Sequence, residues 1–203
     1  STLLAQSIRA SGFYGCSSSS TMQVITPSLP TLIQTKAAVQ GYDAGVSVAV
    51  STLNGSNDSN TSHWSPTLPS ALNGSVLLGS DVILLIGQRP GTAPTWLYAD
   101  TTVGSTSFSV LSVAKLVSNG WLSISNCGQA SLLQINGTPV QVASGASTVN
   151  LTASSSIDTA YSAGAVVVPV SQLAYFVGHA AGSQSALYQA ENTNGNWTIT
   201  PLV

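Results

Sequence analysis

Charged side chains are scarce in this sequence, which has four lysines and arginines and six aspartates and glutamates among 203 residues. Charged residues make up 5% of the chain, whereas about a quarter is usual for a soluble domain. The basic residues are scattered, at Arg9, Lys36, Arg89 and Lys115. Binding to nucleic acid needs several basic side chains that neutralise phosphates together. The sequence therefore argues against a nucleic-acid partner, and for the same reason against anionic lipid.

Long apolar runs are also missing. No apolar stretch of the chain reaches the roughly 18 residues that a membrane-spanning helix needs. The sequence nevertheless starts as if within a helix, because "LLAQSIRA" has Leu4 and Ile8 one turn apart and Gly12 stands where a helix commonly ends. This start within a helix leaves open that a membrane span precedes residue 1.

Cysteine occurs only twice, at Cys16 and Cys127. An even cysteine count beside a surface rich in serine and threonine favours an oxidising compartment and one disulfide. Two buried free thiols are the alternative. A disulfide would close a loop of more than 100 residues and would be worth up to about 4–5 kcal/mol in the chain-entropy model.

Hydroxyl and β-branched residues take the place of the missing charges. The chain has 34 serines and 20 threonines, and its mean hydropathy is +0.31. Short apolar segments separated by glycine, asparagine and proline are typical of an antiparallel sheet system. We expect a half-buried strand over 45–53, a central buried strand within 76–88, a hairpin at 134–142, a strand pair at 164–179 and a hairpin around "ENTNGN".

Motifs of catalysis are absent or weak. The histidines, His63 and His179, have no second ligand at metal-binding spacing, and no G-x-S-x-G elbow occurs. The six carboxylates show no acid-pair motif. A secreted hydrolase would need a histidine within hydrogen-bond reach of a serine or aspartate in a pocket. We expect no enzyme activity, no cofactor and no metal.

Several stretches occur in an order that resembles the PilW family of type IV pilus minor pilins. These are "LLAQSIRASGFYGC" (3–16), "QGYDAG" (40–45), "GSDVILLIGQR" (79–89) and "GWLSISNCGQASLLQI" (120–135), followed by "LAYFVGH" and "SALYQA". The J-type pseudopilins of type II secretion are the nearest competitor. The sequence departs from the family pattern in ending at "TITPLV" and in having "NC" where "DC" is commoner.

The resemblance implies an α+β, pilin-like fold, in which an N-terminal stem helix packs on a head of mostly antiparallel β-sheets. The first half of that helix is a membrane anchor in the family, so the resemblance also implies an anchor upstream of residue 1. Residues 1–203 would form one domain, with 1–12 as the end of the stem helix and 13–203 as the β-rich head. It also implies that Cys16 pairs with Cys127 and ties the helix end to the sheet. The family is not catalytic; it acts in the complex that primes pilus assembly and lies at the pilus tip.

Three helix residues, Leu3, Leu4 and Ile8, are the predicted packing and partner surface, and the head could also accept an added strand at an exposed edge. The expected partners are other minor pilins and a tip adhesin. The expected location is the bacterial cell envelope, in the inner membrane and periplasm before assembly and at the extracellular pilus tip afterwards.

A carbohydrate-binding or adhesin β-domain is an alternative from another functional class. Its candidate residues are the four tryptophans, Trp64, Trp96, Trp121 and Trp197. Such a function would require two tryptophans side by side on one exposed face.

Overall fold

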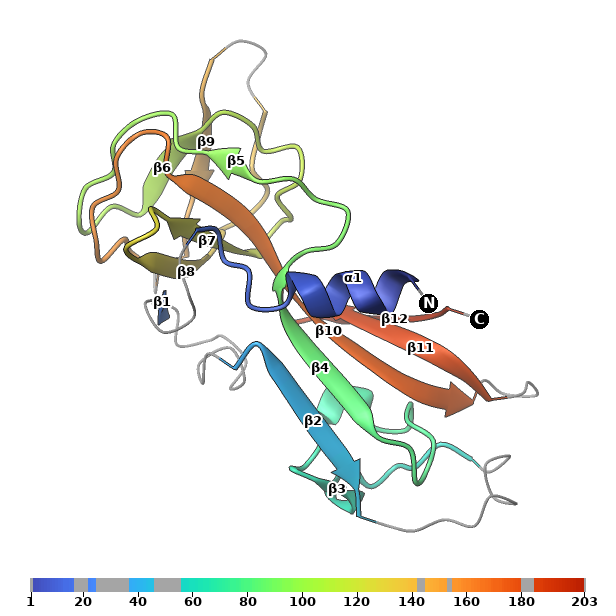
Figure 1. Ribbon diagram of the computed structural model, residues 1–203. Helices are drawn as coiled ribbons and strands as arrows, with labels where there is room; N and C mark the ends of the chain where they lie inside the picture. Colours follow the sequence, from blue (N-terminus) through green and yellow to red (C-terminus); the bar gives the residue numbers. More distant parts are fainter. Residues whose placement is uncertain are drawn as a thin grey trace. The chain divides into compact units, whose positions relative to one another are not determined.

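A computed structural model describes residues 2–16, 22–24, 37–45, 56–141, 145–152, 155–179 and 185–202. The chain divides into two compact units. Unit 1 contains Ser1–Ala38, Ile86–Gln172 and Thr193–Asn196, and unit 2 contains Val39–Leu85, Leu173–Asn192 and Trp197–Val203. Strands β4 (Val82–Gln88) and β10 (Val166–His179) each run from one unit into the other (Figure 1).

Unit 1 is built around a sheet with the strand order β1-β8-β7-β10, to which β5 is added through β10. The β1–β8 pair is parallel, and β7 pairs in antiparallel fashion with both β8 and β10. A second sheet consists of β6 and β9. The elements of this unit are α1 (Thr2–Ala10), β1 (Met22–Val24), β5 (Thr95–Trp96), β6 (Ser107–Val110), β7 (Trp121–Ser125), β8 (Ala130–Gln134) and β9 (Ser147–Asn150).

The core of unit 1 lies between these two sheets. Alternating residues of β7, Leu122 and Ile124, enter it from one sheet, and Phe108 and Val149 enter it from the other. Such alternation is expected because successive strand residues point to opposite faces. The side chains of Ser123 and Ser125 point to the opposite, outer face of β7 and are also fully buried. A further segment of the chain therefore covers this outer face.

Unit 2 is built on a sheet with the strand order β12-β11-β10-β4-β2-β3. The β2–β4, β2–β3 and β11–β12 pairs are antiparallel. Stacking of the Phe176 and Tyr188 rings, with centroids 5.8 Å apart, joins β10 to β11. The remaining elements of this unit are β2 (Val39–Ala44), η3 (Thr61–His63), β3 (Trp64–Ser65), η4 (Ser70–Leu72), β11 (Ser185–Asn192) and β12 (Trp197–Pro201).

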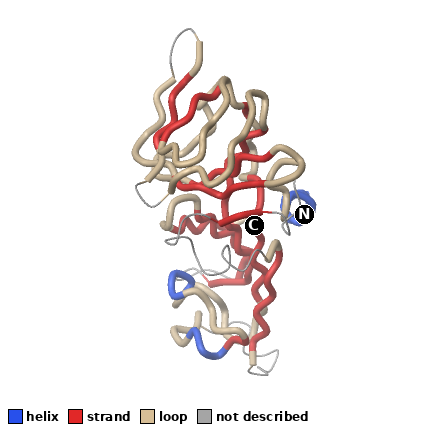
Figure 2. The backbone as a smooth tube through the Cα atoms, turned by 90° about the vertical axis from the view of Figure 1, so that its left-hand side faces the viewer, coloured by secondary structure: helices blue, strands red, loops and turns tan. Residues whose placement is uncertain are grey.

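The predicted α+β pilin fold class is wrong. The described chain is a β-rich fold with one short α-helix, α1, and two single-turn 3₁₀ helices (Figure 2). Nine residues of α-helix rise only about 14 Å, and Leu3 and Ile8 are exposed, so α1 does not form a layer packed against a sheet. The helix itself and its end were predicted correctly, because α1 stops at Ala10 and Gly12 has a φ of +74°.

Strand predictions had mixed outcomes. The buried strand within 76–88 is confirmed as β4, and the hairpin around "ENTNGN" as β11–β12. The strand pair at 164–179 is wrong, because this segment is the single strand β10, with Pro169 inside it. The strand expected at 45–53 falls almost wholly outside the described residues.

The hairpin predicted at 134–142 is also wrong. Asn136 donates its backbone N–H to the Asn150 carbonyl (2.8 Å), and Ile135 forms a bridge with Leu151. The segment after β8 therefore pairs with residues at the end of β9, and a turn at Asn136 and Gly137 does not fold it back onto β8. Pro139 has no N–H with which to continue a ladder.

Candidate functional site

The disulfide predicted between Cys16 and Cys127 is present. Cys16 lies six residues after the end of α1, and Cys127 lies in the turn between β7 and β8, at a φ of +64°. A non-glycine residue at positive φ is uncommon and carries a backbone cost. The disulfide therefore connects the segment that follows the helix to the β7–β8 turn of the central sheet of unit 1.

The segment that covers the outer face of β7 consists of Tyr14, Gly15 and Cys16. Ser123 Oγ donates to the Tyr14 carbonyl (3.0 Å), and the Cys16 N–H donates to Ser125 Oγ (3.2 Å). These bonds explain why two serines are fully buried in a strand, since each hydroxyl has a backbone partner. We call residues 14–16 the clamp segment.

Tyr14 anchors the clamp segment. Its side chain is fully buried, and no described residue pairs with its hydroxyl. Burial raises the pKa of Tyr14 to about 12, because the charged phenolate would lose its hydration. Gly15, beside it, has a φ of +102°, and a Cβ there would overlap the Ser125 side chain. The approach of the clamp segment to β7 thus requires glycine.

The predicted helix surface is accessible on α1. Leu3 is 55% exposed and Ile8 is 44% exposed, while Leu4 is half-buried. Among residues 3–10 of α1, the buried side chain is that of Ser7. Leu3 and Ile8 therefore present apolar groups to solvent, and the packing of these three residues on the head's sheet or on neighbouring pilins stays a prediction.

A second exposed surface lies on unit 1, where three segments run side by side. Leu97 forms an antiparallel bridge with Val110, Tyr98 donates its N–H to the Ser109 carbonyl (2.8 Å), and Ser109 pairs with Thr148 of β9. Cross-strand partners share a face. Trp96, Tyr98, Ser109, Leu111 and Thr148 therefore project on the side opposite the core; we call this surface the neutral face.

Aromatic rings stand at one side of the neutral face. Trp96 is 46% exposed and Tyr98 is 55% exposed. Trp96 ends β5, and Tyr98 follows it by two residues, directly after the bridge that Leu97 forms with Val110. Trp64 and Trp121 are buried in the core, so the tryptophan pair required by the carbohydrate alternative is not formed by them. The sequence analysis missed Tyr98, although the i, i+2 spacing in "TWLYAD" points to it.

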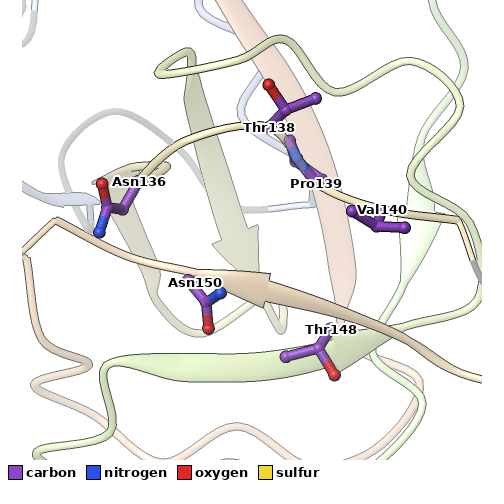
Figure 3. A pocket seen from close by; sticks show the side chains of 6 residues that line it. All are labelled: Asn136, Thr138, Pro139, Val140, Thr148 and Asn150. Carbon is purple, nitrogen blue, oxygen red and sulfur yellow. The ribbon is translucent and has the colours of Figure 1, made fainter.

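A small open pocket of about 220 Å³ borders the other side of the neutral face. The segment after β8 contributes Asn136, Thr138, Pro139 and Val140, and β9 contributes Thr148 and Asn150 (Figure 3). Amide and hydroxyl groups here offer donors and acceptors, and none of the six residues is charged. Thr148 belongs to both the pocket and the neutral face, so the aromatic rings and the pocket are parts of one surface.

An aspartate–histidine pair occurs in unit 2. His63 Nδ1 bonds to Asp58 Oδ2, and His63 Nε2 is 3.0 Å from Asn60 Nδ2. Ser62 donates its hydroxyl to Asn60 Oδ1 (2.7 Å) and not to the histidine. A catalytic triad requires the serine hydroxyl on the second ring nitrogen, a place that Asn60 takes here. The arrangement therefore closes the η3 turn and is not the triad of a hydrolase.

Electrostatics in this turn follow from the same contacts. Burial alone raises the pKa of Asp58, but hydrogen bonds from His63 and from the N–H groups of Asn60 and Ser59, together with the charge of His63, outweigh it and lower that pKa. His179, the other histidine, ends β10, where its backbone N–H donates to Asn57 Oδ1 (2.8 Å). In the described ranges, no three histidine, cysteine or acidic side chains gather as a metal site would require.

Within the described part of the chain, none of the helices has the length and apolar character needed to cross a membrane. Comparisons of the sequence with family models and with curated proteins, and of the structure with solved structures, found no match.

Proposed function

We propose that this chain is a non-catalytic structural subunit of an assembly outside the cytoplasm, specifically a minor pilin of a type IV pilus. The observation that carries the proposal is the disulfide from Cys16 to Cys127, which fastens the end of α1 to the sheet. A disulfide of this kind persists in oxidising compartments. It would keep the helix attached to the head when a filament is under load.

The exposed side chains of α1 support a role in assembly. Leu3 and Ile8 offer apolar area, and Arg9 is the single charged residue of the helix. Burying such side chains against a neighbouring helix stabilises association by about 25 cal/mol per Å² of apolar surface. In this proposal, neighbouring minor pilins cover Leu3, Leu4 and Ile8, and the protein lies in the cell envelope before assembly and at the pilus tip afterwards.

A charge placed on this helix surface is expected to impair assembly. Ile8→Asp puts a carboxylate where an apolar contact is proposed, whereas Arg9→Asp puts a carboxylate on an exposed position about 100° or more around the helix from each of the three interface residues. Each variant is expressed in a strain of the source organism that lacks the gene, and surface pili are counted by electron microscopy. We expect Arg9→Asp to restore piliation and Ile8→Asp to restore less than about a tenth of it. Equal restoration by both variants would contradict the proposed helix interface.

Binding of a neutral carbohydrate is a second candidate function, favoured by the neutral face. Trp96 and Tyr98 offer two exposed rings, and Asn136, Thr148 and Asn150 offer uncharged donors and acceptors beside them. The pocket is smaller than the about 300–1,000 Å³ of pockets for drug-sized ligands, so the occupant that we propose for it is a single sugar ring. A tip subunit could carry such a site, so the two functions are compatible.

Loss of one aromatic ring tests the carbohydrate function. Trp96→Ala is expected to weaken binding of a neutral glycan, first identified on a glycan array, by about fivefold or more, because a stacked ring contributes about 1 kcal/mol beyond area burial. Phe13→Ala, which removes an exposed ring outside the neutral face, serves as the control and should leave binding unchanged. A parent protein that binds no glycan on the array removes this candidate function.

A further inference from the structure

Strand β12 is an unprotected edge of the sheet in unit 2. Among the strands that the structure describes, it pairs with β11 alone, and Thr198–Pro201 are exposed. Its sequence, Trp-Thr-Ile-Thr-Pro, carries no charge. Natural edge strands are usually blunted by charged side chains, bulges or proline, because their free N–H and C=O groups recruit another strand. Here only the last residue, Pro201, blunts the edge.

The register of the β11–β12 hairpin shows which backbone groups of β12 are free. Leu202 donates its N–H to the Leu187 carbonyl (2.8 Å). Hydrogen-bonded pairs alternate along an antiparallel ladder, so Thr198 and Thr200 direct their backbone groups to β11. Trp197 and Ile199 therefore direct their N–H and C=O groups away from β11, toward the open side of the sheet.

We propose that β12 pairs with β12 of a second copy of this chain, in antiparallel register, with Trp197 opposite the partner's Ile199. This register joins every outward N–H to an outward carbonyl, in four hydrogen bonds across the two-fold axis. Thr198 then stands on the axis, opposite the partner's Thr198.

A second copy of the chain is the proposed partner of β12 because this strand is complementary to itself. A two-fold interface requires that one patch fit itself, and this register places an aromatic ring opposite a β-branched side chain twice, a favourable cross-strand pair. An uncharged strand brings no like charges together. Pro201 disfavours the register shifted by two residues, in which Ile199 faces Ile199, because Pro201 has no N–H for the Trp197 carbonyl of the other copy.

The interface is small, since five residues form each strand. Stable interfaces bury at least about 1,000 Å², so the dimer is weak and depends on protein concentration. The proposal is independent of the pilus assignment, because it rests on the edge and register of β12 alone.

Two cysteine variants test the pairing and its register. In Thr198→Cys, the two Cα atoms lie about 4.5 Å apart on the axis, within the range for a disulfide. In the matched control, Thr200→Cys, they lie about 13 Å apart. After mild oxidation, with mass spectrometry confirming the Cys16–Cys127 bond, we expect a cross-linked dimer from Thr198→Cys at least about tenfold faster than from Thr200→Cys. Equal rates, or no cross-linking of either variant, would overturn the proposal.

Sedimentation of the chain without added cysteine provides a second readout. The parent is expected to show concentration-dependent dimerisation that Ile199→Pro abolishes, since that proline removes an outward N–H and no bond to β11. A parent that remains monomeric up to millimolar concentration would also overturn the proposal.

Discussion

Serine at both Cys16 and Cys127 is expected to lower the free energy of unfolding by about 4 kcal/mol. The bond joins residues 111 positions apart, and closing a loop of about that length removes the equivalent of about 4–5 kcal/mol of entropy from the unfolded chain. A change of this size lowers the melting temperature of a chain of this length by about 8–16 °C. In the described part of the chain, the clamp segment is then held to β7 by its two hydrogen bonds with Ser123 and Ser125 and by the burial of Tyr14.

The measurement is chemical and thermal unfolding of the parent and of the double-serine variant, each with and without a reducing agent. The reductant should destabilise the parent and leave the double-serine variant unchanged, which makes each protein a control for the other. A double-serine variant within about 1 kcal/mol of the parent would show that the bond does not restrict the unfolded chain as described.

Alanine at Gly15 is expected to destabilise the protein by about 2–5 kcal/mol. Its Cβ would overlap the Ser125 side chain, and overpacking typically costs about 1–3 kcal/mol. The φ of +102° adds about 1–2 kcal/mol for a residue with a Cβ. Both effects act on the clamp segment, so the variant should also slow formation of the Cys16–Cys127 bond during oxidative refolding.

Gly137→Ala is the matched control for this variant. Gly137 has a φ of +70°, but a Cβ there would meet no atom within 4 Å. It should therefore cost only the backbone strain of about 1–2 kcal/mol and leave disulfide formation unchanged. Equal losses of stability in the two variants would mean that residues 14–16 do not lie against β7.

Local features of the fold could be predicted from the sequence. The run "VILLIGQ" is apolar and β-branched, which indicated the buried strand β4 before any partner strand was known. Gly12 indicated the end of α1, and "ENTNGN" indicated the β11–β12 turn. The disulfide was indicated by an even cysteine count beside a surface rich in serine and threonine, and by the family resemblance. In each case the signal lies within a few residues or in the composition.

Features that depend on distant pairing could not be predicted. Asn136 and Gly137 are typical of a hairpin, but pairing of Ile135 with Leu151 competes with that turn and prevails. Tyr98 joins the neutral face only because Leu97 bridges Val110. The fold class was wrong for a different reason: the family resemblance suggested a helix layer, and the described helix is nine residues long with exposed apolar side chains.

Piliation of a strain that lacks this gene tests the proposed function most directly. Electron microscopy of the deletion strain, of the strain complemented with the parent gene and of the strain complemented with the double-serine variant would count surface pili per cell. We predict few or no pili after deletion, full recovery with the parent and poor recovery with the double-serine variant. Normal piliation of the deletion strain would contradict the assignment as a minor pilin.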